Sequence, residues 1–445
     1  MDEALILARA QFGLNIGFHI LFPSITIGLG WMLVVFRLRY QRTRNEDEKR
    51  AWLATYKLWV KVFALSFAMG VVSGVAMSFQ FGTNWPGYMN KVGNIAGPLL
   101  GYEVLTAFFL EATFLGVMLF GMDRVPGWAH VASTVMVAFG TTLSAFWILA
   151  LNSWMQTPAG HVMDGNAIVA GSWLAVMFNP SFPYRFAHML LASGITAAFL
   201  VAGLSAWRLL QAADDAGARA TLRFGVRLAA VLVPLQILAG DLHGLNTLEH
   251  QPAKIAAMEA LWQTERGAPL VLLAIPNEER KRNDFALTIP YAASIVLTHE
   301  KTGEVKGIDA FGADHPPVAP LFFAFRVMVG MGVLMLCLSW FTAFVIYKKG
   351  EVKRSLLWCL ASFTFSGWLA TLAGWLVTEI GRQPWLVTGI LRTADATGEA
   401  SGAQLGASLT AYVLTYSVLL LAYIVVLTHL AAKGDSAGLM KGDVR

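Results

Sequence analysis

Residues 101–116, GYEVLTAFFLEATFLG, hold two glutamates inside an apolar stretch that runs from 97 to 121. About 20 apolar residues are enough to cross a bilayer as a helix. A charged side chain at the bilayer centre costs about 2.5–3.5 kcal/mol on insertion scales and usually serves a function. On a regular helix Glu103 and Glu111 would lie about 80° apart around the axis and about 12 Å apart along it, so both can face one interior. The alternative is that each only hydrogen-bonds a neighbouring helix.

The composition is that of an integral membrane protein. Of the 445 residues, 56% are hydrophobic and only 14% are charged, and the mean hydropathy is +0.57. A soluble domain averages about 25% charged residues. The net charge is +5, but the basic residues fall between the apolar stretches, so the charge does not indicate binding to nucleic acid. The two cysteines have neither disulfide-framework nor metal-site spacing. The acidic start, MDEALILARA, lacks the features of a signal peptide, so the first span is expected to remain.

The hydropathy pattern predicts an all-α integral membrane protein with nine transmembrane helices. The expected spans are 14–36, 57–80, 97–121, 128–151, 185–207, 224–241, 319–346, 356–378 and 407–430. Lysine and arginine favour the cytoplasmic ends of spans, and long loops count little. Nineteen of them lie on one side of this arrangement and five on the other, apart from the long loop. The N-terminus is therefore expected outside and the C-terminus in the cytoplasm.

This topology divides the chain into three parts. Residues 1–241 carry the first six spans, 242–318 form a long outer loop, and 319–445 carry the last three spans. The loop segment QPAKIAAMEALWQTE, residues 251–265, is expected to form a helix. The loop is too short to build a large core of its own, so it is expected to lie on the outer face of the bundle.

The unusual polar residues of the spans gather in the outer leaflet of the predicted topology, and only Glu111 lies deeper. Histidine and methionine together suit a heme iron with both axial positions filled, which favours electron transfer. A histidine in a span is about as often only a hydrogen-bonding residue, and most of the 17 methionines are expected to fill the core. The outer-leaflet residues are His19, Glu103, His188, Arg326, Met328, Glu379 and Arg382.

Two further polar residues lie on the predicted loop helix. Lys254 and Glu259 would be about 140° apart around its axis, so they do not form a simple salt bridge. Each could still reach the polar head of a ligand. The alternative for both is a solvated helix face.

Eight stretches spread over the whole bundle form a specific combination. They are QFGLNIGFHILF (11–22), FQFGTNW (79–85), YEVLTAFFLEATF (102–114), LSAFWILALNSWMQTP (143–158), FAHMLLASG (186–194), KIAAME (254–259), FRVM (325–328) and GWLVTEIGRQPW (374–385). Together they resemble subunit I of the cytochrome bd-type quinol oxidases. The loop between the sixth and seventh spans is short, which resembles the short Q-loop, cyanide-insensitive branch of that family.

The resemblance implies heme ligands among these residues. His188 and Met328 match the two axial ligands of a low-spin heme, heme b558. His19 and Glu379 match axial ligands of the two other hemes, heme b595 and heme d, or a third heme b in place of heme d. Glu103 matches a residue at that di-heme site. The resemblance also implies a cofactor-side position for Arg326, Trp375 and Arg382.

The resemblance further implies the paths of protons and substrate. Glu111 matches a residue of the proton route from the cytoplasm, and Ser144 and Asn152 match polar positions on a proton path. Lys254 and Glu259 match quinol-site residues of the outer loop, the Q-loop.

The implied activity is that of a terminal oxidase in the bacterial cytoplasmic (inner) membrane. Ubiquinol or menaquinol would be oxidised at the outer loop and oxygen reduced to water with protons from the cytoplasm, which generates proton motive force. The implied partners are an oxidase subunit II, forming a heterodimer, and in many members a small single-span subunit.

Two other classes of protein remain open at this stage. A proton-coupled transporter would use Glu103, Glu111 and Glu379 as relay carboxylates, but the sequence lacks the inverted repeats and broken helices of many transporters. A structural heme-binding anchor would need only His188 and Met328, and would leave the other polar residues of the spans unexplained.

Overall fold

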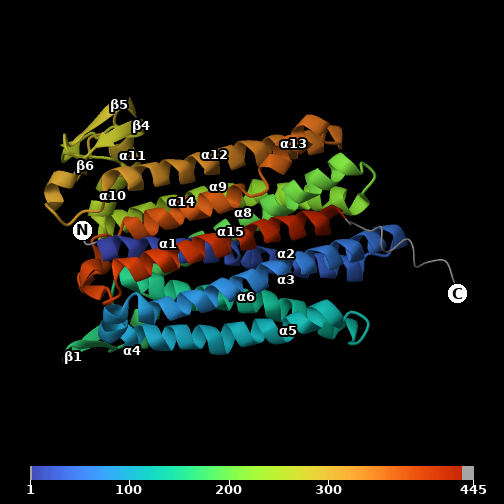
Figure 1. Cartoon of the computed structure of the whole chain (residues 1–445). Helices are drawn as coiled ribbons and strands as arrows, with labels where there is room; N and C mark the ends of the chain where they lie inside the picture. The colour runs from blue at the N-terminus through green and yellow to red at the C-terminus, as the bar shows by residue number, and fades with distance from the viewer. Residues whose placement is uncertain (1–2, 433–445) are drawn as a thin grey trace.

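The computed structural model describes residues 3–432. Within this range, nine helical stretches are long and apolar enough to cross a membrane, as the hydropathy pattern predicted. Figure 1 shows them side by side along one common axis, with connections at both ends. The end that carries residues 251–317 is called the loop end below.

The first span consists of two helices instead of one. Helix α1 covers Glu3–Leu21 and α2 covers Pro23–Arg42, and the two make a stretch of 40 residues that is longer than the predicted span at 14–36. Pro23 occupies the start of α2. Proline has no N–H to donate but fits the first turn of a helix, which explains why the chain restarts there.

The other spans are longer than predicted, mainly because helices continue beyond the apolar core of the bilayer. For example, the span predicted at 224–241 is a helix that runs through Pro234 to His250. Because this helix continues to His250, the long loop begins at residue 251 and not at residue 242 as predicted. These spans are α3 (Glu46–Thr83), α4 (Pro86–Tyr102) with η1 (Glu103–Phe108) and α5 (Phe109–Phe120), α6 (Gly127–Gln156), α8 (Phe182–Gln211), α9 (Ala216–His250), α12 (Val318–Lys349), α13 (Arg354–Ser362) with α14 (Ser366–Ile380), and α15 (Gly402–Ala432).

Large buried side chains and small contact residues hold the helices together. Phe22, Phe63 and Trp59 lie at the centre of the main core cluster, which joins α1, α2, α3 and α8. Where α2 meets α8, a Cβ on Gly28 would overlap the carbonyl of Ser193. Close helix contacts of this kind are typical of membrane bundles, where small residues let backbones approach.

The helix predicted at 251–265, in the first part of the long loop, is shorter than expected. Helix α10 covers only Pro252–Met258, and Ala260 has a φ of 51°, a left-handed conformation that a helix cannot continue through. The apolar stretch that follows forms the strand β4 (Leu270–Asn277). The other later elements of the loop are β3 (Glu265–Arg266), β5 (Arg282–Ile289), α11 (Ala292–Thr298), β6 (Glu304–Val305) and η2 (Ile308–Phe311).

Two shorter segments complete the loop end. One contains β1 (His161–Asp164), β2 (Ala167–Ala170) and α7 (Trp173–Met177), and the other contains β7 (Trp385–Val387), β8 (Leu391–Arg392) and η3 (Thr393–Ala396). The loops of the described chain thus contain four two-stranded sheets, β1–β2, β3–β6, β4–β5 and β7–β8, whereas the spans are all helical, as predicted.

Candidate heme and quinol site

A cavity of about 1810 Å³ lies among the helices. One small-molecule site usually occupies about 300–1,000 Å³, so this cavity has room for more than one ligand. Ten of the eleven predicted site residues line it, and only Arg326 lies outside its wall. The ten are His19, Glu103, Glu111, His188, Lys254, Glu259, Met328, Trp375, Glu379 and Arg382.

The two glutamates of the third span are brought together by an irregular turn. Residues Glu103–Phe108 form a π-helical segment between α4 and α5. A π-helix takes more residues per turn than an α-helix, so Glu111 is rotated toward the side of Glu103. The separation of about 80° expected for a regular helix is therefore wrong. π-helical turns occur frequently at functional sites, and both carboxylates line the cavity.

The surroundings of the two carboxylates differ. Ser144 on α6 donates a hydrogen bond of 2.7 Å to Glu103. Glu111 is buried, and its Oε1 atom has no hydrogen-bond partner among residues 3–432. Gly140 makes room for it, because a Cβ there would lie 2.7 Å from Cγ of Glu111. A buried carboxyl without a paired cation is suited to carrying a proton.

His19 is held in an orientation that suits a metal ligand. Its Nδ1 atom lies 3.0 Å from Oγ of Ser73, and that hydroxyl donates to the carbonyl of Met69 at 2.8 Å. The imidazole must then be the donor to Ser73, which leaves Nε2 with a free lone pair. Gly74 packs against the ring, since a Cβ there would lie 3.1 Å from Cε1. Histidine ligands are commonly oriented by such a bond to their second nitrogen.

His188 on α8 and Met328 on α12 also lie beside glycines. A Cβ on Gly240 would lie 3.3 Å from the His188 ring, and one on Gly374 would lie 2.9 Å from the sulfur of Met328. The side chain of Gln236 lies 3.0 Å from Nε2 of His188, and Nδ1 has no partner within the described chain. An orphaned, buried imidazole nitrogen fits a metal ligand.

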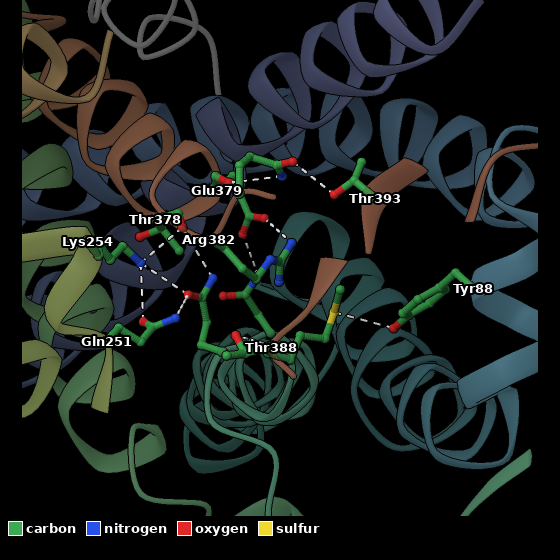
Figure 2. Close-up of polar contacts among 12 residues, drawn as sticks. Tyr88, Gln251, Lys254, Thr378, Glu379, Arg382, Thr388 and Thr393 are labelled. Atoms are coloured by element: carbon green, nitrogen blue, oxygen red, sulfur yellow. Dashed lines mark hydrogen bonds and ion pairs between the residues drawn. The ribbon is translucent and has the colours of Figure 1, made fainter. Parts of the chain in front are cut away.

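Glu379 forms a polar cluster with residues of two other segments (Figure 2). It is ion-paired with Arg382 and accepts a hydrogen bond of 2.8 Å from Asn152 on α6. Arg382 is buried, and its Nε and Nη1 atoms have no partner among the residues that the structure describes. Glu379 and Arg382 thus lie together, as their shared place in the predicted outer leaflet indicated, and Asn152 joins them through a contact that could not be derived from the sequence.

Lys254 lies inside the protein and not on an exposed helix face. Its side chain is only 3% exposed, and Nζ donates to Oε1 of Gln156 and the carbonyl of Thr378, both at 3.1 Å, and to Oε1 of Gln251 at 3.4 Å (Figure 2). Burial holds the pKa of Lys254 well below its usual range, and the neighbouring Arg185 acts in the same direction. This lysine therefore fastens α10 to α6 and α14.

Arg185 is a site residue that the sequence analysis missed. It is buried on α8, lines the cavity, and has an Nε atom without a partner in the described residues. Arg185 and Arg382 thus place two buried guanidinium cations near one carboxylate, Glu379. Buried cations without counter-charges are costly, so an anionic ligand fits here, and heme propionates carry such carboxylates. Arg185 lies three residues before His188, on the same helix face, which was the available signal.

Glu259 is paired with Arg326 and not with Lys254. Nη2 of Arg326 lies 2.8 Å from the Glu259 carboxylate, and the guanidinium also donates to the carbonyls of Met258 at 2.7 Å and Val271. Arg326 therefore fastens the long loop to α12. The cofactor-side position that the resemblance implies for Arg326 stays a prediction.

Membrane-spanning helices around a cavity lined by histidine, methionine and glutamate side chains define a multi-pass membrane protein with a buried cofactor site. A sequence model described as Cytochrome bd terminal oxidase subunit I matches residues 7–435. This chain belongs to that family.

Named relatives support the same conclusion. The chain is 32% identical to the Cytochrome bd-II ubiquinol oxidase subunit 1 of Escherichia coli over 509 residues, covering 98% of each chain. It is 34% identical to the Cytochrome bd ubiquinol oxidase subunit 1 of Bacillus subtilis over 433 residues, covering 93% of this chain and 91% of the relative. A solved structure of the bd oxidase from Geobacillus thermodenitrificans matches with a TM-score of 0.87 and 30% identity, over 96% of this chain and 98% of that one.

The family gives the chain its general activity. It is a quinol oxidase subunit, an oxidoreductase of respiratory electron transport in the bacterial inner membrane, with heme cofactors and a quinol substrate. Family membership argues against the transporter and anchor alternatives.

Proposed function

We propose that this chain is the catalytic subunit that uses electrons from quinol to reduce oxygen to water, with protons drawn from the cytoplasm. The observation that carries the proposal is the convergence of His19, His188, Met328 and Glu379 on one cavity. Hemes bound there would supply electron transfer and oxygen chemistry.

His188 and Met328 would hold the low-spin heme b558, since imidazole and thioether fill both axial positions. His19, with its free Nε2, and Glu379 would serve the two other hemes, heme b595 and heme d or a third heme b. Trp375 lines the same cavity beside α1. The propionates would be bound by the buried guanidinium groups of Arg185 and Arg382, each of which has an Nε atom without a partner in the described residues.

Quinol would be oxidised next to α10, one of the parts of residues 242–318 that line the cavity. Glu259 is the base in this proposal: it accepts a proton from a quinol hydroxyl while Arg326 keeps its carboxylate in place. Each quinol gives up two electrons and two protons. Lys254 acts as a support for α10 and not as a direct ligand, because it is buried among protein acceptors.

Protons for water would travel along the third and fourth spans. Glu111 would accept them from the cytoplasmic side and pass them to Glu103, which Ser144 orients. Asn152 links the same helix, α6, to Glu379. The charge separation then follows from releasing quinol protons at the outer face and taking up protons at the inner face.

We also propose a membrane orientation and a subunit composition. The N-terminus would lie outside and the C-terminus in the cytoplasm, and the loop end would be the outer face. An oxidase subunit II, and in addition a small single-span subunit, would complete the enzyme. Residues 1–241 and 319–445 would carry the hemes, and the loop would be of the short, cyanide-insensitive type.

The test is quinol-driven oxygen uptake by the purified complex in proteoliposomes, with membrane potential followed by a dye. Glu111→Gln should lower turnover by about 10²-fold or more and abolish the potential while heme content stays unchanged, because the amide cannot carry the proton. Glu399→Gln, at an exposed loop position, is the control and should behave as the wild type. Unchanged turnover and potential in Glu111→Gln would contradict the proton route.

A further inference from the structure

The β4–β5 hairpin of the long loop has an unusual apolar outer face. Leu273 and Leu287 are cross-strand partners, and both are exposed, as is Ile275. Phe285 is 90% exposed. Val271 and Ala274 point the other way, into the loop core. A two-stranded hairpin with such a face is marginal in water, and exposed apolar patches usually mark an interaction surface.

The backbone conformation of Phe285 is a second indication that the exposed apolar face has a function. Its φ is 53°, in the left-handed region, which is unfavourable for a bulky residue. Strained residues persist where the surrounding structure holds them, and they cluster at functional sites. Here the strained residue is also the most exposed large apolar side chain of the described chain.

Several contacts fix the hairpin beside the start of α12. Glu278, at the tip of the hairpin, accepts hydrogen bonds from the backbone N–H groups of Val318, at 2.7 Å, and Ala319, at 3.4 Å. Arg326, about two turns further along α12, donates to the carbonyl of Val271 on β4. The hairpin therefore lies along the first turns of a membrane span.

This position places the hairpin at the membrane surface. Helix α12 has 32 residues, about 48 Å in length, whereas the hydrocarbon core of a bilayer is about 30 Å thick. The first turns of α12 thus lie near the headgroup region. Figure 1 shows the hairpin beyond α12 at the loop end, projecting sideways from the bundle axis, so in a bilayer crossed by α12 it would lie over the surrounding lipid.

The hairpin face also continues a lipid-facing surface. Phe323 and Val327 on the first turns of α12 are exposed, as expected for side chains in contact with lipid. Arg280 and Lys281 are exposed at the hairpin tip, where they can meet lipid phosphates. Arg282, in contrast, is paired with Asp284 at 2.8 Å. Apolar side chains with basic neighbours are the pattern of an interfacial membrane segment.

We propose that the β4–β5 hairpin rests in the lipid of the leaflet at the loop end, with Leu273, Ile275, Phe285 and Leu287 among the acyl chains next to the headgroups. Residues Val296 and Leu297 of α11, the next element, line the wall of the large cavity. The hairpin therefore holds the loop against the membrane where a lipid-dissolved substrate would pass into the cavity. This last step rests on the proposed quinol site.

The location can be tested without any oxidase activity. Phe285→Cys, combined with Cys337→Ser and Cys359→Ser, is spin-labelled in the full complex in nanodiscs. Collision with oxygen, which concentrates in lipid, should dominate at position 285, and collision with a water-soluble nickel chelate should dominate at the control position, Glu399→Cys. A label at 285 that is as accessible to nickel as the control, or shielded from both reagents by protein, would overturn the proposal.

The effect on substrate access has its own test. Phe285→Ser with Leu287→Ser should raise KM for a long-chain, membrane-dissolved quinol at least about threefold, while KM for a short-chain soluble quinol, kcat and the heme spectrum stay unchanged. Tyr347→Ser, an exposed aromatic at the opposite end, is the control. Equal KM changes for both quinols would overturn the access role. Absence of quinol oxidation in the wild type would instead reject the proposed function and leave the spin-label result standing.

Discussion

At the scale of single residues, Ser73 decides which nitrogen of His19 is free. Ser73→Ala should remove the bond to Nδ1 and weaken the basicity of the imidazole. We expect a lower iron–histidine stretching frequency in the resonance Raman spectrum of the reduced protein, and about 1 kcal/mol less stability. Ser78→Ala is the matched control, because its hydroxyl lies on the same helix and donates only to the carbonyl of Gly74. An unchanged stretching band in Ser73→Ala would contradict the orientation of His19.

Met328 offers a second test at this scale. Met328→Leu removes the thioether but keeps the volume of the side chain, so one heme should change from low spin to high spin in the optical and electron paramagnetic resonance spectra. Met331→Leu, almost one turn further along α12 in a core cluster, should leave the spectra unchanged. A heme that stays low-spin without Met328 would show that another residue is the ligand.

Sequence alone could identify site residues of rare type in a span, such as His19, Glu103, His188 and Glu379. It could not find Ser73 or Arg185, since serine and arginine near span ends are common and their roles depend on how helices are aligned. For the same reason, the sequence did not predict that Lys254 is buried. Its burial follows from contacts with Gln156 and Thr378, which lie far away in the chain.

At the scale of elements, the π-helical turn Glu103–Phe108 sets the relation between Glu103 and Glu111. Deleting Leu105, which is exposed, should convert the turn to regular α-helix and rotate Glu103 away from Ser144. We expect oxygen uptake to fall at least about tenfold, while the low-spin heme spectrum, which depends on α8 and α12, is kept. Leu105→Ala keeps the turn and should retain activity. Full activity in the deletion variant would contradict a role for the turn.

The sequence predicted the elements that consist of a long apolar run, because such a run crosses the membrane as a helix. It did not predict the elements whose bounds depend on the backbone conformation of single residues or on pairing with another segment. The nine spans follow from hydropathy alone. The end of α10 follows from the left-handed Ala260, and the strand β4 from its pairing with β5, and neither has a clear local signal. The π-helical turn likewise has no sequence signature in GYEVLTAFFLEATFLG.

At the scale of the whole molecule, the heme site depends on side chains that come together only in the folded bundle. Segments from both halves of the chain bring ligand-type side chains to one cavity, and two buried guanidinium cations, Arg185 and Arg382, stand beside one carboxylate there. The sequence predicted that these residues share one leaflet. The size of the cavity and the excess of positive charge could be recognised only after the helices were assembled.

The most direct test is a reduced-minus-oxidised absorption spectrum of the purified complex, with heme extraction from the same sample. The account predicts three hemes per copy of this chain, one of them low-spin, with a far-red band if heme d is present and without it if a third heme b takes its place. Complete absence of heme from an intact complex would contradict the central claim that this cavity is a heme site.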